Sequence, residues 1–227
     1  MKKPTRCGEA SFLLGVIVLG FGTALMQLSR FGMSVVVTPA YVLSAWLGVI
    51  PPGAMCYICQ GLLIVLTSLM MRRFRVTYLF SFLNAVLFGL SVDFFAQICF
   101  PGVHPETVLG RIALFVPGFL CNSLGVAMLF HTYFPPQAPE LFVKELAGKR
   151  GLKLYKVKYG YDLCSCALSI VLSFLLLGKW DFSIIGAGTV VCAFLNGPLI
   201  GLWGKGLDRI AGYDAAFTRL GAIFENN

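Results

Sequence analysis

Six long apolar segments dominate this sequence and leave few folds open to it. A helix needs about 20 mostly apolar residues to cross roughly 30 Å of hydrocarbon. Charged residues make up only 12% of the chain, against about 25% in soluble domains, so a water-soluble enzyme is excluded. A transmembrane β-barrel would instead show alternating stretches of about ten residues. The apolar segments cover about residues 10–29, 54–71, 76–98, 111–133, 159–178 and 182–203.

We therefore predict an all-α membrane protein whose 227 residues form a single membrane domain (1–227) with six transmembrane helices. Basic loop residues are retained in the cytoplasm. Of the 18 Lys and Arg residues, six spans place only Arg30, Arg111 and Lys179 outside, so the remaining 15 lie inside. Both termini should then be cytoplasmic, with a C-terminal tail at about 204–227. The basic charge borders helix ends, which favours anionic lipid headgroups as partners over nucleic acid.

The apolar segments fall into two similar halves. Pro39 breaks a short apolar stretch after the first segment, and Pro139 occupies the corresponding place after the fourth. Two further spans follow each of these stretches. Because three spans per half is an odd number, the second half enters the membrane upside down, which is an inverted-topology repeat. We predict repeats at about 10–98 and 111–203.

The two Pro-broken stretches, residues 34–50 and 135–150, have two interpretations. They are short or re-entrant helices, or they are amphipathic helices that lie on the two membrane surfaces. Helix ends at membrane depth leave backbone groups that protein, water or a ligand must cover. The last span contains Asn196-Gly-Pro198, and since proline removes a backbone donor, we expect a broken helix there.

Short motifs containing Gly and Pro recur along the chain. They are Pro39-Ala-Tyr-Val-Leu-Ser-Ala-Trp-Leu, Gly53, Arg72-Arg73, Leu83-Asn84-Ala85, Gly89 and Asp93 in the first half, with Gly186-Ala-Gly-Thr189 and Asn196-Gly-Pro-Leu-Ile200 in the second. This pattern resembles the YczE/YitT-like family of bacterial membrane proteins over nearly the whole chain. Two positions depart from the family pattern, because Tyr41 stands where the family often has Asp, and Phe80-Ser81 replaces Gly-Thr. The resemblance implies an integral protein of the bacterial cell (inner) membrane, often supposed to be a transporter, and supplies no catalytic residues.

Asp93 is the clearest charged residue within a predicted span. Charges inside a bilayer cost roughly 2.5–3.5 kcal/mol at its centre, so they are functional candidates by default. Gln97 follows Asp93 one turn later on the same face. These two residues are candidates for an ion or proton site or for a gate. The structural alternative is that Asp93 pairs with Arg111 or ends a helix.

Polar side chains line one face of the fifth span and of the second span, its repeat counterpart. Ser165 and Ser169 follow Asp162 at helical spacing. Two such stripes on equivalent helices predict a cavity between the halves, although Ser and Thr also serve close helix packing. Polar side chains that face lipid are costly, so the set should face inward. The predicted substrate-binding residues are Gln60, Asn84, Asp162, Ser165, Ser169 and Asn196.

These features favour a small secondary-type transporter or exporter that works by alternating access between inverted repeats. Few of the predicted lining residues are charged, so the unknown substrate should be a small, mostly apolar or amphipathic molecule with a small polar head. The alternative is a membrane accessory or scaffold protein whose basic cytoplasmic loops recruit a partner. We expect no enzyme, because the sequence offers neither paired carboxylates nor a nucleophile with a base, and we expect no metal and no cofactor. The sequence leaves open whether the chain forms a homo-oligomer.

Overall fold

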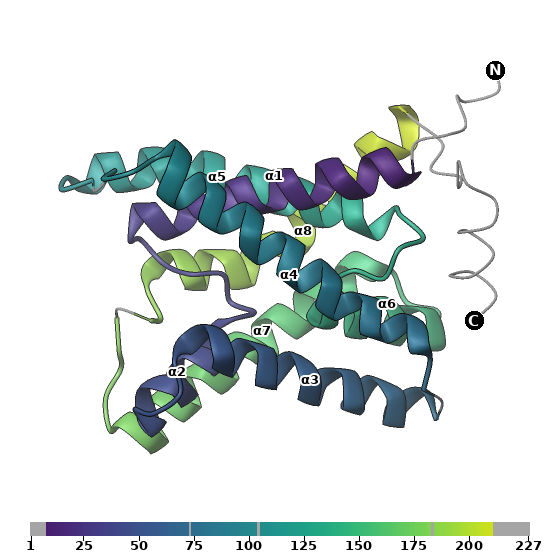
Figure 1. Cartoon of the computed structure of the whole chain (residues 1–227), viewed down its shortest axis with the longest axis horizontal. Helices are drawn as coiled ribbons and strands as arrows, with labels where there is room; N and C mark the ends of the chain where they lie inside the picture. The colour runs from purple at the N-terminus through teal and green to yellow at the C-terminus, as the bar shows by residue number, and fades with distance from the viewer. Residues whose placement is uncertain (1–7, 73, 104, 183, 211–227) are drawn as a thin grey trace.

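The structure is a computed structural model that describes residues 8–72, 74–103, 105–182 and 184–210. Every regular element in this part of the chain is helical (Figure 1). The elements are α1 (Gly8–Ser29), α2 (Thr38–Leu47), α3 (Pro52–Met71), η1 (Val76–Leu79), α4 (Phe80–Asp93), η2 (Phe94–Cys99), α5 (Val108–Phe130), α6 (Ala138–Arg150), α7 (Leu154–Leu172), η3 (Ser173–Leu177) and α8 (Ala187–Ile210). The helix α4 continues into η2, and α7 continues into η3.

The six predicted spans are confirmed as six helices that are long and apolar enough to cross a membrane. They are α1, α3, α4 with η2, α5, α7 with η3, and α8. Large hydrophobic side chains cover their outer faces, and Leu62, Leu69 and Leu90 are each more than 60% exposed. Exposing so much apolar surface to water is unfavourable, whereas a bilayer accommodates it. The chain is therefore a multi-pass helical membrane protein.

Two helix boundaries and one expected helix break differ from the sequence-based expectation. The helix α7 begins at Leu154 and not near residue 159, so it includes Lys158. The helix α8 continues to Ile210, through the first residues of the expected tail, and residues 211–227 of that tail lie outside the described residues. The expected break at Pro198 is wrong, because α8 runs through this proline. A proline within a membrane helix is tolerated where adjacent turns and helices satisfy the freed backbone groups.

The two ends of the molecule differ in charge. The end at which α1 begins also holds the last turns of α3 and α5 and the turn between α6 and α7 (Figure 1). Arg72, Lys149, Arg150 and Lys153 are exposed there, and we call it the basic end. The helices α1 and α4 finish at the opposite end, which we call the Asp93 end.

The antiparallel helices α1 and α5 pack most extensively and lie together along the top of Figure 1. Glycines allow this approach. A Cβ at Gly22 would lie 2.4 Å from the backbone nitrogen of Asn122, and one at Gly125 would lie 2.6 Å from that of Leu19. Small residues let membrane helices approach closely in this way. The helix α4 packs against α1, and α8 packs against both α5 and α7. We call α1, α4, α5 and α8 the first layer and α3 with α7 the second layer.

The two Pro-broken stretches form the short helices α2 and α6. Each has a proline in its first turn, Pro39 or Pro139, where the missing N–H has no helical partner to lose. Each ends at a glycine in the left-handed region, Gly48 with φ 68° or Gly151 with φ 61°, which is a common way to stop a helix. Both short helices pack on α3 and α7, so they fill the space between these two spans.

Candidate functional site

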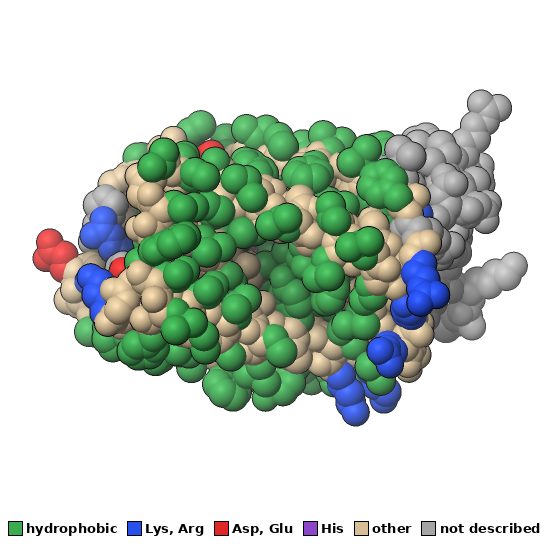
Figure 2. All heavy atoms as spheres, turned by 90° about the horizontal axis from the view of Figure 1, so that it is seen from below, with side chains coloured by type: hydrophobic (Ala, Val, Ile, Leu, Met, Phe, Trp, Pro, Cys, Tyr) green, Lys and Arg blue, Asp and Glu red, His purple; other side chains and the backbone are tan. Residues whose placement is uncertain are grey.

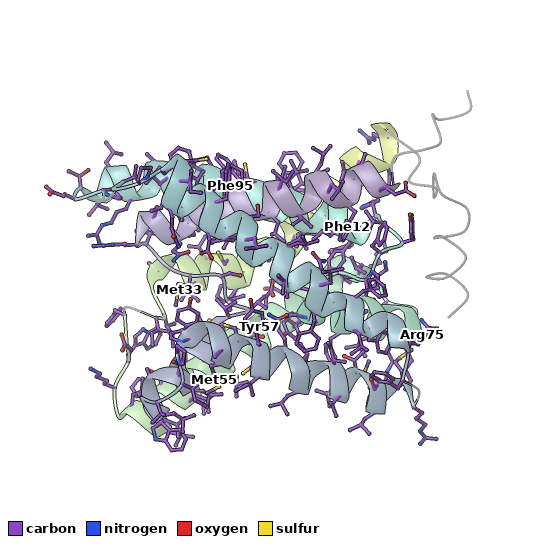
Figure 3. All side chains as sticks on the ribbon, in the orientation of Figure 1. Phe12, Met33, Met55, Tyr57, Arg75 and Phe95 are labelled. Carbon is purple, nitrogen blue, oxygen red and sulfur yellow. The ribbon has the colours of Figure 1, made fainter. Side chains whose placement is uncertain are left out.

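A cavity of about 290 Å³ lies between the two layers, and we call it the central cavity. Residues of all six long helices, and of both short ones, contribute to its wall. Tyr57 on α3 and Met33, from the segment before α2, lie between the layers (Figure 3). The exposed residues Gly53 and Asp93 mark its mouth at the Asp93 end. Its polar lining residues are Thr23, Gln27, Ser34, Tyr41, Tyr57, Gln60, Asp93, Asn122, Gln137, Glu140, Lys158 and Asn196.

A buried cluster of charges forms one wall of the central cavity. The Nζ of Lys158 is 2.9 Å from Oδ1 of Asp162, one turn further along α7, and 3.2 Å from Oε1 of Glu140 on α6. Lys158 and Asp162 are fully buried, and Glu140 is 6% exposed. Burying a lone charge is prohibitively costly, and pairing offsets that cost. We call these three residues the Lys158 cluster, and it carries one more negative than positive group.

The position of Lys158 differs from the one expected from the sequence, which counted it among the basic loop residues. Counting Lys158 with a cytoplasmic loop was wrong, because α7 begins before this residue and its ammonium lies inside the bundle. Glu140 belongs to a helix whose charges resemble those of a surface helix, yet Pro139, Glu140 and Leu141 are all buried. The one signal in the sequence that could have revealed the pair is the spacing of Lys158 and Asp162, which are one helical turn apart and therefore neighbours on one face.

Asn196 on α8 holds Asp162 from the opposite side. Its Nδ2 donates a hydrogen bond of 3.0 Å to Oδ2 of Asp162, because an ionised carboxylate can only accept. The orientation of the amide is thereby fixed. Its Oδ1 has no hydrogen-bond partner among the described residues, although Asn196 is only 5% exposed. Gln60 on α3 also lines the central cavity, and its buried Oε1 likewise lacks a partner in the described part of the chain.

A second cavity, of about 390 Å³, lies among α2, α3, α6 and α7, and we call it the lateral hollow. Figure 2 shows this side of the molecule, where hydrophobic side chains surround a hollow near the middle. Leu62 and Leu168 line it, and both are more than half exposed. Cys56, Gln60 and Gln137 line the lateral hollow and the central cavity alike. The two cavities are therefore adjacent, and these side chains form a wall that they share.

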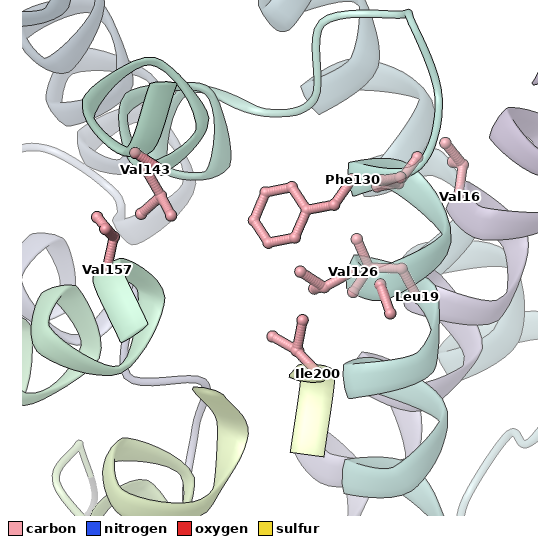
Figure 4. Close-up of a cluster of buried hydrophobic side chains, with 10 residues drawn as sticks. Val16, Leu19, Val126, Phe130, Val143, Val157 and Ile200 are labelled. Carbon is pink, nitrogen blue, oxygen red and sulfur yellow. The ribbon is translucent and has the colours of Figure 1, made fainter. Parts of the chain in front are cut away.

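The central cavity is closed toward the basic end by buried hydrophobic side chains, which we call the hydrophobic plug. Leu19 and Val126 belong to it and also line the cavity. Beyond them, Phe130 of α5 points toward Val143 of α6 and Val157 of α7 (Figure 4). The plug consists of Val16, Leu19, Val126, Ala127, Leu129, Phe130, Val143, Ala147, Val157 and Ile200. It joins five helices, so it separates the cavity from the basic end.

Three of the predicted substrate-binding residues line the two cavities, and a fourth, Asp162, lies directly behind a lining residue. Gln60 and Asn196 line the central cavity, and Ser165 lines the lateral hollow. Asp162 is fully buried and pairs with Lys158, which itself lines the central cavity. The polar stripe of α7 and its counterpart on α3 are thus brought to the same place in the bundle.

The other two predicted residues, Asn84 and Ser169, line neither cavity among the residues described for them. The Nδ2 of Asn84 donates to the carbonyl of Pro135 over 3.4 Å. The Oγ of Ser169 is 2.9 Å from Oγ1 of Thr38 on α2 and donates to the carbonyl of Ser165. Asn84 thus links α4 to the segment before α6, and Ser169 donates within its own helix where α7 packs beside Thr38 of α2. Ser and Thr commonly occupy such close helix contacts in membranes.

Asp93 lies at the mouth of the central cavity, as a gate residue would. The Nε2 of Gln97, one turn later, donates to its Oδ1 over 3.4 Å. The Nε of Arg111 instead donates to the carbonyl of Pro105 over 3.4 Å, so the alternative role of Asp93 as its partner has no support. Within the described residues, no group of three or more His, Cys, Asp or Glu side chains could hold a metal ion.

Residues 8–205 match the model of a family of unknown function (DUF6198). The match covers the first five long helices and most of α8. The comparisons with curated proteins and with solved structures found no match. The resemblance to the YczE/YitT-like proteins stays a prediction. Since the family brings no activity with it, the role of the two cavities has to be inferred from their own geometry.

Proposed function

We propose that this chain, which belongs to the DUF6198 family of unknown function, is a small secondary-type transporter or exporter. It moves a small, mostly apolar or amphipathic molecule by alternating access between two inverted three-span repeats. Its location is a bacterial cell membrane, with both termini in the cytoplasm, as the positive charge at the basic end favours.

Corresponding elements support the two repeats. The helices α1 to α4 and α5 to α8 follow the same order of long, short, long and long. Tyr57 and Thr67 on α3 fall in the same register as Tyr159 and Ser169 on α7. The hydroxyls of Thr67 and Ser169 make equivalent hydrogen bonds to the carbonyl four residues earlier, at 2.7 and 2.8 Å. Inverted repeats of this kind bind their substrates at the interface between the halves.

The beginnings of α2 and α6 support re-entrant helices. Pro39 and Pro139 both line the lateral hollow, one from each short helix. The residues that precede the two helices, Val37 and Gln137, line both cavities. Both helices therefore start beside the cavities. Discontinuous helices that begin at membrane depth are a recurring way for transporters to direct backbone N–H groups at a substrate.

The observation that carries the proposal is that equivalent helix pairs differ between the halves. On the closed side α7 packs on α8, and a Cβ at Gly197 would lie 2.7 Å from Cβ of Tyr159. On the open side a Cβ at Gly89 would meet only Oη of Tyr57, at 3.7 Å. Exchanging the two arrangements between the halves closes the Asp93 end and opens the basic end, which is alternating access.

Cys56 provides a test that needs no substrate, because it lines both cavities. Two variants each keep one native cysteine, Cys56 or Cys99, with every other cysteine replaced by alanine. In right-side-out and inverted vesicles, a small membrane-impermeant thiol reagent should label Cys56 from both sides. Cys99 is exposed near the Asp93 end and should be labelled from one side only. Labelling of Cys56 from the Asp93 end alone would contradict transport.

The second candidate function is a membrane accessory or scaffold protein that recruits a cytosolic partner. The end of α6, the start of α7 and the turn between them favour it, because Lys149, Arg150, Lys153 and Lys156 are exposed there at the basic end. For a scaffold, replacing these four residues by glutamine abolishes recruitment of the partner, and Cys56 is labelled from one side only.

A further inference from the structure

We propose that the central cavity binds the protonated amino group of an amphipathic amine whose apolar chain lies in the lateral hollow. This inference deepens the proposed function, on which it rests for the passage of the molecule through the protein. It concerns binding alone, so it can be tested without a transport assay.

The charge of the central cavity favours a cation. Asp93 and Glu140 line it, and Asp162 lies behind Lys158. Among the described lining residues, Lys158 is the only Lys or Arg, and its ammonium is already shared between two carboxylates. Three carboxylates and one ammonium leave a net charge of −2 when all four are ionised. Coulomb interactions are strong in a low-dielectric interior, so a carboxylate or phosphate ligand is disfavoured there and a cation is favoured.

The hydrogen-bonding groups of the cavity favour an N–H donor in particular. The Oδ1 of Asn196 and the Oε1 of Gln60 are buried acceptors without a partner among the described residues. An unmet buried acceptor costs free energy that a donor from a ligand recovers. A primary ammonium brings three N–H donors, whereas a quaternary ammonium brings none. The cavity thus distinguishes two cations of equal charge.

The lateral hollow supplies the place for the rest of the molecule. It adjoins the central cavity at Gln60 and Gln137, which line both, and its wall is mostly apolar. A head group held beside Gln60 therefore has an apolar surface within reach on the side of Leu62 and Leu168. An inorganic cation would leave this hollow unused. An alkyl chain attached to the ammonium fills it and removes apolar surface from water.

Binding of three matched probes to the full chain in lipid nanodiscs tests the proposal. The probes are hexylamine, hexyltrimethylammonium and hexanoate at pH 7, titrated calorimetrically with protein-free nanodiscs as the blank. The wild-type chain should bind hexylamine about tenfold or more tightly than hexyltrimethylammonium, as expected for hydrogen bonds to a charged group. Hexanoate should not bind. Equal binding of the two cations, or hexanoate binding as tightly as hexylamine, would overturn the inference.

Gln60→Met is the decisive variant, because it removes the acceptor and keeps the size of the side chain. The acceptor has no protein partner among the described residues, so Gln60→Met should melt no lower than wild type and yet bind hexylamine about tenfold more weakly. Ser68→Ala is the control, a polar-to-apolar change on α3 outside both cavities. If Gln60→Met binds like Ser68→Ala, the assignment is wrong. A chain that binds hexylamine but labels Cys56 from one side only would lose transport and keep this site.

Discussion

The Lys158 ammonium lies between two carboxylates. This arrangement decides how strongly a substitution of each of the three residues destabilises the protein. Asp162 has a second partner in Asn196, whereas Glu140 is held to the cluster by Lys158 alone among its described ion pairs. Removing one member of a buried ion pair leaves the other uncompensated. Replacing the Lys158 cation by a neutral side chain should therefore destabilise the protein more than replacing either carboxylate.

Lys158→Met should therefore destabilise the protein strongly. It leaves two buried carboxylates without their cation, at an expected cost of about 3–5 kcal/mol. The matched control is Lys156→Met, because Lys156 is exposed two residues earlier on α7, and such surface changes usually stay within about 0.5 kcal/mol. Thermal unfolding in a mild detergent compares the two variants. Equal melting temperatures would mean that the Lys158 cluster contributes nothing to folding.

At this scale the sequence predicted the polar side of the site better than its charge. Gln60, Asp162 and Asn196 stand out because polar residues within apolar runs need an inward face. Lys158 does not stand out, because it ends a basic run that reads as a loop. Glu140 is separated from it by a turn, so only the fold brings the two together. Long-range charge pairing of this kind leaves no local pattern in one sequence.

At the scale of helices, glycine and tyrosine positions distinguish the two sides of the molecule. Gly197 and Gly201 on α8 accept Tyr159 and Tyr155 of α7 at close range. Gly89 on α4 has room for a Cβ, whereas Gly197 on α8 does not. The helices α7 and α8 are therefore in close contact, whereas α3 and α4, the pair that the proposed repeat makes equivalent, leave space between them.

Alanine at the two equivalent glycines should act in opposite directions. Gly197→Ala places a Cβ within 2.7–2.9 Å of Cβ, Cα and N of Tyr159, so it should destabilise the present arrangement by about 1–3 kcal/mol through overpacking. Gly89→Ala meets only Oη of Tyr57 at 3.7 Å and should be tolerated. For a transporter, Gly197→Ala raises labelling of Cys56 from the basic end, and Gly89→Ala lowers it. A shift in the same direction for both variants would argue against equivalent helix pairs.

The helices themselves are the part of the fold that composition predicts, since a bilayer requires long apolar segments. Their boundaries are less predictable where charge and apolar residues mix, as at the start of α7. The prediction of a break at Pro198 was wrong for a different reason. The helix α8 contacts α5 and α7 both before and after this proline, through Gly188, Gly197, Gly201 and Trp203. The distribution of helix contacts decides such cases, and a single sequence does not contain it.

At the scale of the whole molecule, the unequal charge of the two ends is the support for the proposed orientation in the membrane. The basic end carries the exposed turn between α6 and α7, and positively charged loops stay in the cytoplasm. Anionic headgroups of the inner leaflet add attraction of about 1 kcal/mol for each basic residue near the surface. In the proposed orientation the Asp93 end faces outward, together with the mouth of the central cavity.

A cysteine introduced at Leu152 reports this orientation. Leu152 is 54% exposed in the turn at the basic end, so Leu152→Cys should react only from the cytoplasmic side in a chain without other cysteines. Cys99 alone should react only from outside. Intact cells treated with a membrane-impermeant maleimide separate the two. Labelling of the Leu152→Cys variant in intact cells would reverse the assignment of both ends.

The position of the lateral hollow also determines in which units the concentration of an amphipathic ligand should be expressed in a binding measurement. Its rim residues Leu62 and Leu168 face the hydrocarbon, so an amphipath arrives there from solution in lipid and its bulk aqueous concentration matters little. Each added methylene shifts partitioning into the bilayer by about 0.8 kcal/mol, or roughly fourfold. The apparent affinity, calculated from the total concentration of added compound, should therefore rise about fourfold for each methylene in a homologous series. It should fall when extra empty liposomes are supplied. Expressed as moles per mole of lipid, the same data should collapse onto one curve.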